Sequence, residues 1–133
     1  MAIKSDPQTW ADPRHRLGLK GEKLAGEFLM RRGWRIEGHR FRMGRLEVDL
    51  IARRGPLVVF VEVKTRYGTA FGSPLEAVTA RKQREIVRVA RAWIDRYGKP
   101  GDQYRLDVIA VTFSGGLGPK IEHIQNAFWP GWR

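Results

Sequence analysis

The fold is decided by the stretch LEVDLIARRGPLVVFVEVKTR, residues 46–66. Two runs of aliphatic and β-branched residues, 46–52 and 57–63, flank the break Arg53-Arg54-Gly55-Pro56. β-branched residues favour strands, and a Gly-Pro pair between two such runs is a turn signal. The stretch therefore predicts a β-hairpin.

The acids of this hairpin are its unusual feature. Pairing Ala52 with Leu57 across the turn would place Asp49 opposite Phe60. It would also place Glu47 opposite the acid at position 62. Alternation of side chains along both strands then puts three carboxylates and one ammonium on one face: Glu47, Asp49, Glu62 and Lys64.

Like charges directly opposite each other destabilise a sheet, so a cation should offset them. Carboxylate oxygens are ligands that Mg²⁺ uses, and a nearby Lys stabilises charge on an attacked phosphate. The pattern of Asp49 followed by Glu62-x-Lys64 indicates a metal-dependent phosphodiesterase site. Glu-Val-Lys alternation is also typical of any strand with one wet face. Residues 57–61, however, are apolar on both faces, as in a central strand, and this favours the site.

The length and composition fit a single domain. A chain of 133 residues, 42% of them hydrophobic, can bury one core and leaves little room for a second. Residues 1–13 mix Pro, Asp, Gln and Trp without a period, so we expect a flexible N-terminal arm there. Residues 14–133 are expected to form one nuclease-like domain.

The charge balance is strongly basic. Lys and Arg number 25 against 14 acids, a formal net charge of +11. Such a charge predicts a polyanionic partner, nucleic acid first. An anionic membrane surface is the competing partner, but it needs a basic segment with a free apolar face, and both expected helices need theirs for the core.

The sequence excludes several kinds of chemistry. It has no cysteine, which rules out disulfides, thiolate catalysis and Cys-ligated zinc. His15, His39 and His123 are scattered without ligand spacing. There is no run of about 18 apolar residues and no signal-peptide core, so we expect a cytoplasmic protein.

A first helix is predicted between Arg14 and Arg32, because apolar residues recur there at helical spacing and Gly33 follows as a C-cap would. At about 100° per residue, Glu22 falls at the margin of the buried stripe, where it can face a site. Glu27 falls on the opposite flank. We interpret it as a solvated charge that pairs along the helix.

A second helix is predicted from the N-cap Thr79 to Tyr97, ending at Gly98. Gln83 falls within its apolar stripe, where the amide either hydrogen-bonds to backbone or reaches the acidic cluster. Lys82, at the edge of the stripe, can also reach the acids. Four arginines gather on the exposed face: Arg81, Arg84, Arg88 and Arg91. Further strands are expected over residues 34–41, 104–112 and 121–124.

Six motifs in a fixed order run between about Gly18 and Phe128. They are Gly21-Glu22, Gly33-Trp34-Arg35-Ile36, Glu47-Val48-Asp49-Leu50-Ile51, Val59-Phe60-Val61-Glu62-Val63-Lys64-Thr65-Arg66, Pro74-Leu75-Glu76-Ala77-Val78 with Lys82, and Arg105-Leu106-Asp107-Val108-Ile109. Together they resemble the YraN-like family of predicted bacterial endonucleases. That family is similar to the archaeal Holliday-junction resolvases and belongs with the restriction-endonuclease-like, PD-(D/E)XK, nucleases.

The resemblance implies an α/β fold with a restriction-endonuclease-like αβββαβ core, a mixed central sheet flanked by helices. It implies a set of ligands for Mg²⁺ or Mn²⁺: Asp49, Glu62, Val63 and Glu22. It implies catalytic roles for these acids and for Lys64, and Gln83 resembles a polar helix residue that some of these nucleases add. Leu46 departs from the family pattern, which has Gly there, and Gly44 stands two residues earlier, so we expect a rebuilt turn before Glu47.

The leading hypothesis is a Mg²⁺- or Mn²⁺-dependent endonuclease that hydrolyses DNA phosphodiester bonds, with branched or single-stranded DNA as candidate substrates. The expected nucleic-acid contacts are basic: Arg66, Arg81, Lys82, Arg84, Arg88 and Arg91. The alternative is a non-catalytic basic nucleic-acid-binding module that retains the nuclease fold. DNA is favoured over RNA, although a nuclease acting on RNA stays open. No membrane partner is expected, and a homodimer is left open.

Overall fold

The computed structural model describes residues 6–7, 16–68, 72–116 and 118–128, with the side chains at positions 16 and 17 left out. The expected arm over residues 1–13 lies outside the described residues apart from Asp6 and Pro7. The elements in chain order are α1 (Arg16–Arg31), β1 (Arg35–Met43), β2 (Leu46–Arg54), β3 (Leu57–Tyr67), the 3₁₀ helix η3 (Pro74–Ala77), α2 (Ala80–Tyr97), β4 (Gln103–Phe113) and β5 (Lys120–Ile124). This order confirms the α/β class and the αβββαβ core.

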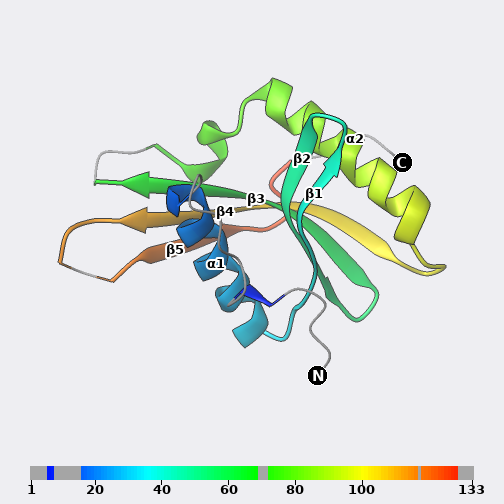
Figure 1. The fold of residues 1–133 in the computed structure, drawn as a ribbon, viewed down its shortest axis with the longest axis horizontal. Helices are drawn as coiled ribbons and strands as arrows, with labels where there is room; N and C mark the ends of the chain where they lie inside the picture. Colours follow the sequence, from blue (N-terminus) through cyan, green and yellow to red (C-terminus); the bar gives the residue numbers. More distant parts are fainter. Residues whose placement is uncertain (1–5, 8–15, 69–71, 117, 129–133) are drawn as a thin grey trace.

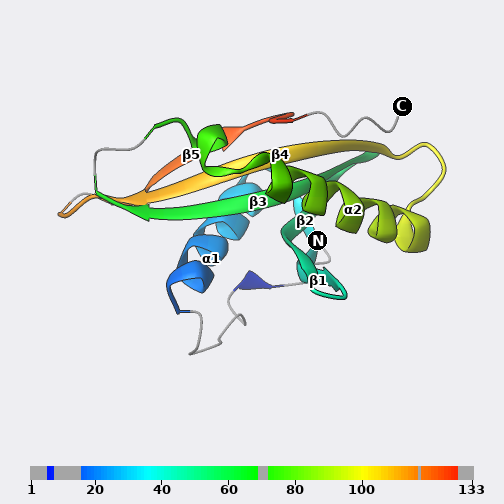
Figure 2. The ribbon, with the colours of Figure 1, turned by 90° about the horizontal axis from the view of Figure 1, so that it is seen from above.

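The five strands form one mixed sheet in the order β1-β2-β3-β4-β5. β3 and β4 run parallel, because η3 and α2 connect them across one face, and the other neighbours are antiparallel. Helix α1 packs on one face of the sheet and α2 on the other (Figures 1 and 2). Within the described part of the chain, neither helix has the length and apolar character needed to cross a bilayer.

β3 is the central strand that the sequence predicts, and it is buried on both faces. On the α1 side it contributes Val59, Val61 and Val63 to a core that includes Leu29 and Trp34. On the α2 side it contributes Val58 and Phe60, which pack with Ile86, Val89 and Trp93. The alternation of β3 thus fixes which of its later side chains face each helix.

Both helices end where the sequence predicts. Gly33 has φ of 88°, and the N–H of Trp34 donates to the Leu29 carbonyl at 3.1 Å, a Schellman arrangement that satisfies the end of α1. At the start of α2, the Thr79 hydroxyl accepts a hydrogen bond of 3.1 Å from the N–H of Lys82. These caps fix the axial position of the residues just inside each helix.

The β2–β3 hairpin pairs two residues out of the expected register. Ala52 pairs with Val59 rather than with Leu57, so the prediction that Asp49 stands opposite Phe60 is wrong. Because the shift is an even number of residues, the paired side chains keep their predicted faces: Leu50 and Ala52 lie on the α1 side, and Ile51, Val58 and Phe60 on the α2 side. The alternation of β2 changes before Leu50, because Val48 packs on the α2 side together with Ile51.

The cause of the shift is a tighter turn than the sequence suggests. Both arginines of the expected four-residue break continue β2, and Arg54 pairs with Leu57. The turn is only Gly55-Pro56. Gly55 has φ of 61°, as a type II′ turn requires at its first central residue, and Pro56 is confined to the negative φ of the second.

A second two-residue turn joins β1 to β2. Met43 pairs with Leu46, and Gly44 has φ of 61°. Leu46, the position that departs from the family pattern, follows this turn directly, begins β2 and packs on the α2 side.

Asp107 fastens the far side of the sheet. Its fully buried carboxylate accepts hydrogen bonds from Arg105 Nε at 2.8 Å and from the backbone N–H of Asn126 at 2.9 Å, and His123 Nε2 lies 2.7 Å away. Burial raises the pKa of Asp107, but these hydrogen bonds outweigh it and lower the pKa overall. The carboxylate therefore clamps β4 to β5 and to the turn after β5.

Candidate active site

Asp49 and Glu62 meet where β2 separates from β3. The pairing of the two strands stops at Leu50 and Val61, one residue before each acid. There Asp49 Oδ2 accepts a hydrogen bond of 2.7 Å from the backbone N–H of Val63. Burial, together with the charge of Glu62 and a hydrogen bond to its side chain, raises the pKa of Asp49 well above its ordinary value.

Glu62 is buried and only partly compensated. It is 4% exposed, and among the described residues no donor bonds to its buried Oε1. Its nearest cation is Lys82 at the start of α2, whose Nζ lies 3.9 Å from Oε2. A buried carboxylate oxygen without a donor normally costs free energy, so the pair fits a site for a positive ligand.

Glu22 approaches the same region from α1, but it is already engaged. Arg40 donates to both of its oxygens, from Nε at 2.9 Å and from Nη2 at 3.0 Å, and His39 Nε2 lies 2.7 Å from Oε1. Burial raises the pKa of Glu22, but the hydrogen bonds and charges of His39 and Arg40 lower it by more, so the pKa lies below its ordinary value. The sequence predicts Glu22 at the margin of the buried stripe of the helix. Its side chain is in fact buried, with 8% of its surface exposed.

Two irregularities in β1 direct Arg40 and His39 toward α1. Glu37 is an extra residue in β1, because Ile36 pairs with Ala52 and Gly38 pairs with Ile51. Arg40 has φ of 53°, a left-handed conformation that non-glycine residues rarely adopt. Such bulges and left-handed residues re-aim side chains within a strand.

Arg40 links Glu22 to the hairpin acids. Its hydrogen bond to Glu22 raises the pKa of its guanidinium, and the negative charges of Glu47 and Asp49 act in the same direction. The charge of Glu22 in turn raises the pKa of Asp49. The site is therefore one electrostatic unit drawn from α1, β1, β2 and β3.

The predicted cluster differs from the observed one at Glu47. Glu47 pairs across the β1–β2 hairpin with Arg42, whose Nε donates to it at 2.7 Å. The prediction that Glu47 stands opposite Glu62 is wrong, because the hairpin is shifted by two residues and Asp49 is the acid that meets Glu62. Lys64 follows Glu62 by two residues, so alternation puts its half-buried side chain on the same face.

Gln83 and Lys82, at the start of α2, were both expected to be able to reach the acids, and only one of them does. Gln83 Nε2 donates a hydrogen bond of 3.1 Å to the Val78 carbonyl, which is the backbone alternative. Lys82 is the residue that reaches the acids, through Glu62.

The other basic residues expected to bind nucleic acid lie along β3 and α2. Arg66 continues the row of Glu62 and Lys64, donates to the Gly72 carbonyl at 3.1 Å and lines a polar cavity of about 230 Å³. On α2, Arg81 lies 3.5 Å from Glu85. The other three α2 arginines expected to bind nucleic acid are exposed: Arg84, Arg88 and Arg91.

The carboxylate oxygens of Asp49 and Glu62 fit the ligand preference of a hard divalent cation. Mg²⁺ prefers oxygen ligands and often takes only one or two protein carboxylates, with water completing its shell. Within the described residues no group of three or more His, Cys, Asp or Glu gathers into a metal-binding set. The residues that could hold such a cation are therefore Asp49 and Glu62, beside the backbone of Val63. Glu22 is occupied by its hydrogen bonds with Arg40.

His39 and Arg40 were not predicted from the sequence as partners of Glu22. Neither has a spacing that points to Glu22, because a bulge and a left-handed residue set their directions. The one available signal was the high density of arginine before position 54.

These observations define a basic α/β protein with a restriction-endonuclease-like core and two adjoining carboxylates, the buried Glu62 and the half-buried Asp49. The chain belongs to UPF0102, described as an uncharacterised protein family, whose model matches residues 21–111. This confirms the expected YraN-like family, and the matched span contains every residue of the site above.

Several relatives cover most of the chain. It is 48% identical over 112 residues to a UPF0102 protein of Geobacter sulfurreducens, and the matched region covers 84% of this chain and 88% of that protein. It is 46% identical over 112 residues to a UPF0102 protein of Rhodococcus jostii, covering 84% and 95%. A UPF0102 protein of Chlorobium phaeobacteroides is 44% identical over 119 residues, covering 86% and 94%.

Proposed function

We propose that this protein is a metal-dependent endonuclease that hydrolyses phosphodiester bonds in DNA. The observation that carries the proposal is the meeting of Asp49 with Glu62, a half-buried and a buried carboxylate, with one Glu62 oxygen left without a donor among the described residues. Structural acids are normally neutralised by partners, as Glu22 is by Arg40. A pair of carboxylates that keeps one buried oxygen without a donor is typical of a cation site.

Mg²⁺ or Mn²⁺ at this pair would supply an activated water and stabilise charge on the attacked phosphate. The residues of the chain hold the reacting group in place. Val63 orients Asp49 through its backbone N–H, and Lys64 presents an ammonium that donates hydrogen bonds to a phosphate oxygen. Lys82 holds the second oxygen of Glu62 at 3.9 Å and adds positive charge on the other side.

The net charge supports a polyanionic substrate. With a formal charge of +11, the protein should attract nucleic acid over long distances at low salt. Arg66 follows Lys64 along β3, and Arg84 and Arg88 follow Lys82 along α2, so a strand that reaches the acids would have basic residues near its path.

The decisive experiment incubates the full chain with duplex, single-stranded, flap, junction and RNA substrates, with and without Mn²⁺. We expect cleavage of DNA only with the metal, and loss of at least 100-fold in rate on Asp49→Asn. Glu47→Gln is the matched control, because it removes a carboxylate two residues away that pairs with Arg42. Equal rates for the two variants would contradict the assignment.

One observation favours a second candidate, a nucleic-acid-binding module without catalysis. Glu22 is saturated by Arg40 and His39, which leaves two acids rather than three for a cation. Under this alternative, Asp49→Asn does not change the affinity for nucleic acid. Adding Mn²⁺ changes that affinity in neither the wild type nor the variant. Calorimetric titration of the protein with Mn²⁺ separates the two candidates without any cleavage assay.

A further inference from the structure

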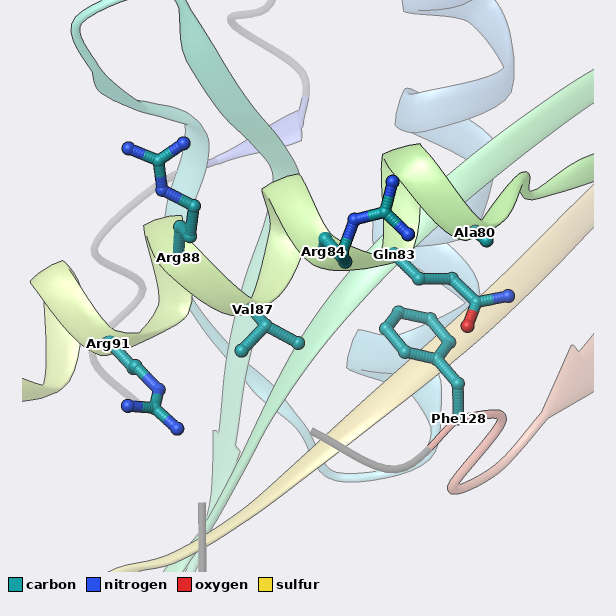
Figure 3. Close-up of a pocket in the computed structure, with 7 residues that line it drawn as sticks. All are labelled: Ala80, Gln83, Arg84, Val87, Arg88, Arg91 and Phe128. Atoms are coloured by element: carbon teal, nitrogen blue, oxygen red, sulfur yellow. The ribbon is translucent and has the colours of Figure 1, made fainter. Parts of the chain in front are cut away.

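A groove runs along α2 beside the end of the described chain. One stripe of the helix lines it, with residues spaced by three and four positions from Ala80 to Arg91, and Phe128 lines its other side. The groove has a volume of about 490 Å³. Figure 3 shows the Phe128 ring beside the Gln83 side chain, with Val87 and Arg91 extending from α2 on the same side.

The lining changes from apolar to basic toward solvent. Val87 and Phe128 are half-buried and pack partly against the α2 core, whereas Arg84 and Arg88 are exposed. At about 100° per residue, Val87 is turned toward the sheet and the two arginines toward solvent. Among the residues that the structure describes, no acid lines the groove, and neither Arg84 nor Arg88 forms an ion pair.

The groove begins next to the candidate active site. Gln83, which lines it, follows Lys82, whose ammonium lies 3.9 Å from Glu62. The Gln83 amide is held by its hydrogen bond to the Val78 carbonyl, so this junction is fixed. A chain that lies in the groove therefore leads toward the acids.

We propose that this groove is a subsite for an unpaired nucleotide, with the base against Phe128 and Val87 and the phosphates on Arg84 and Arg88. The inference rests on the proposed nucleic-acid substrate and names its class: DNA with a single-stranded segment. A cationic rim over an aromatic, apolar floor matches the two parts of a nucleotide, and stacking on an aromatic ring accepts any base. A base within a duplex is already stacked and paired, so it does not reach the ring.

The test measures binding alone, in buffer without divalent metal. Fluorescence anisotropy of the full chain is recorded with a labelled single-stranded oligonucleotide, a duplex of the same sequence and an abasic oligonucleotide of the same length. For Phe128→Leu, which keeps apolar volume but loses the ring, we expect about 10-fold weaker binding of the single strand. Duplex and abasic affinities should change less than about 2-fold.

Matched controls keep the result interpretable. Phe113→Leu alters a half-buried ring outside the groove and should change no affinity. Because Phe128 contacts the core, a second variant that touches only the surface, Arg84→Gln with Arg88→Gln, is measured as well. It should lower the slope of log affinity against log salt by about 1.4 on single strands, at roughly 0.7 per phosphate contact, and Arg96→Gln should not.

Three outcomes overturn the subsite. Phe128→Leu can leave single-strand affinity unchanged, or it can weaken all three oligonucleotides equally. Alternatively, it can convert a dimer into a monomer in sedimentation, which would make the groove an interface between copies of the chain. The subsite stands apart from catalysis: Phe128-dependent binding of single strands without metal-dependent cleavage would support the groove and refute the nuclease.

Discussion

The backbone N–H of Val63 donates a hydrogen bond of 2.7 Å to Asp49 Oδ2, so the acid of β2 is tied to the residue that follows Glu62 on β3. Since the two strands stop pairing one residue earlier, this bond takes the place of the next ladder bond. A side chain thus continues the sheet at the point where the backbone separates. It also holds two carboxylates together that would otherwise repel each other.

Asp49→Asn should leave the metal-free protein as stable as wild type or more stable, by up to about 3 kcal/mol at neutral pH, because it removes one of two adjoining carboxylates that repel each other. Burial raises the pKa of Asp49, so folding favours its protonated form. Wild-type stability from this group is therefore lost as pH rises above the unfolded value of 3.8. Thermal unfolding in a metal chelator, at several pH values, measures the difference.

The same unfolding curves in the presence of Mn²⁺ supply the control for Asp49. Wild type should gain stability with added metal and Asp49→Asn should gain none, because ligands stabilise only the state that binds them. An Asp49→Asn protein that is unfolded in chelator at neutral pH would mean that the carboxylate is structural.

Gly21→Ala should loosen the packing of α1 on β3 and destabilise the protein by about 1–3 kcal/mol. A Cβ at position 21 would collide with the Thr65 hydroxyl and lie 3.0 Å from its Cβ. Thr65→Ala removes the hydroxyl and the methyl, so the double variant should recover part of the loss. Chemical denaturation of the four proteins measures the coupling, and additive effects would place the clash elsewhere.

Most of the fold could be predicted from the sequence because its signals are local. Periodicity indicated α1 and α2, and Gly33 and Thr79 marked their ends, since each supplies a specific cap. The register of β2 and β3 could not be fixed in the same way. Both Ala52 with Leu57 and Ala52 with Val59 keep the apolar faces together, and only the turn geometry at Gly55 decides between them.

The candidate site was predictable only in part, for the same reason. Glu62 and Lys64 lie on β3, whose alternation fixes their faces, and the even shift in register preserved them. Asp49 lies where the alternation of β2 changes, between Val48 and Leu50, and its hydrogen bond from Val63 brings it to Glu62. The clasp of Glu22 by Arg40 depends on a bulge and on a left-handed φ of 53°, neither of which has a sequence signal in an arginine. Irregular backbone therefore decided the part that was missed.

Asp102→Asn should cost about 2 kcal/mol at neutral pH, because Asp102 closes the ends of β2 and β4 through Arg53. The hydrogen bond with Arg53 lowers the pKa of Asp102 from 3.8 to about 2. Its contribution is present above pH 3.8 and is lost as pH falls to about 2. Unfolding in urea between pH 2 and pH 6 tests this, with Asp95→Asn on the exposed side of α2 as the control.

An acid transition for Asp102→Asn that has the same size as that of wild type would show that the ion pair with Arg53 contributes nothing. Arg53 Nε also donates to Glu37 at 2.9 Å, so the Arg53 guanidinium keeps one acidic partner in this variant. The comparison therefore isolates Asp102 without leaving the guanidinium unpaired.

Glu22→Gln should weaken Mn²⁺ binding 10- to 100-fold, and the reason is the residue that Glu22 holds. The bidentate bond from Arg40 keeps the guanidinium on α1, while the charge of Asp49 already attracts it. Gln cannot accept both N–H groups, so Arg40 should turn toward Asp49 and compete with the metal. Removing one partner of a largely buried pair should also destabilise the protein by about 2–3 kcal/mol.

The double variant Glu22→Gln with Arg40→Gln separates competition from simple damage. If Arg40 competes with the metal, removing it should restore Mn²⁺ affinity in calorimetric titration, even though stability stays below that of wild type. Glu27→Gln, on the opposite flank of α1, should bind the metal as wild type does. Were the double variant to bind Mn²⁺ as weakly as Glu22→Gln alone, the Glu22 carboxylate itself would be acting on the ion, and its bond to Arg40 would have to break whenever the metal binds.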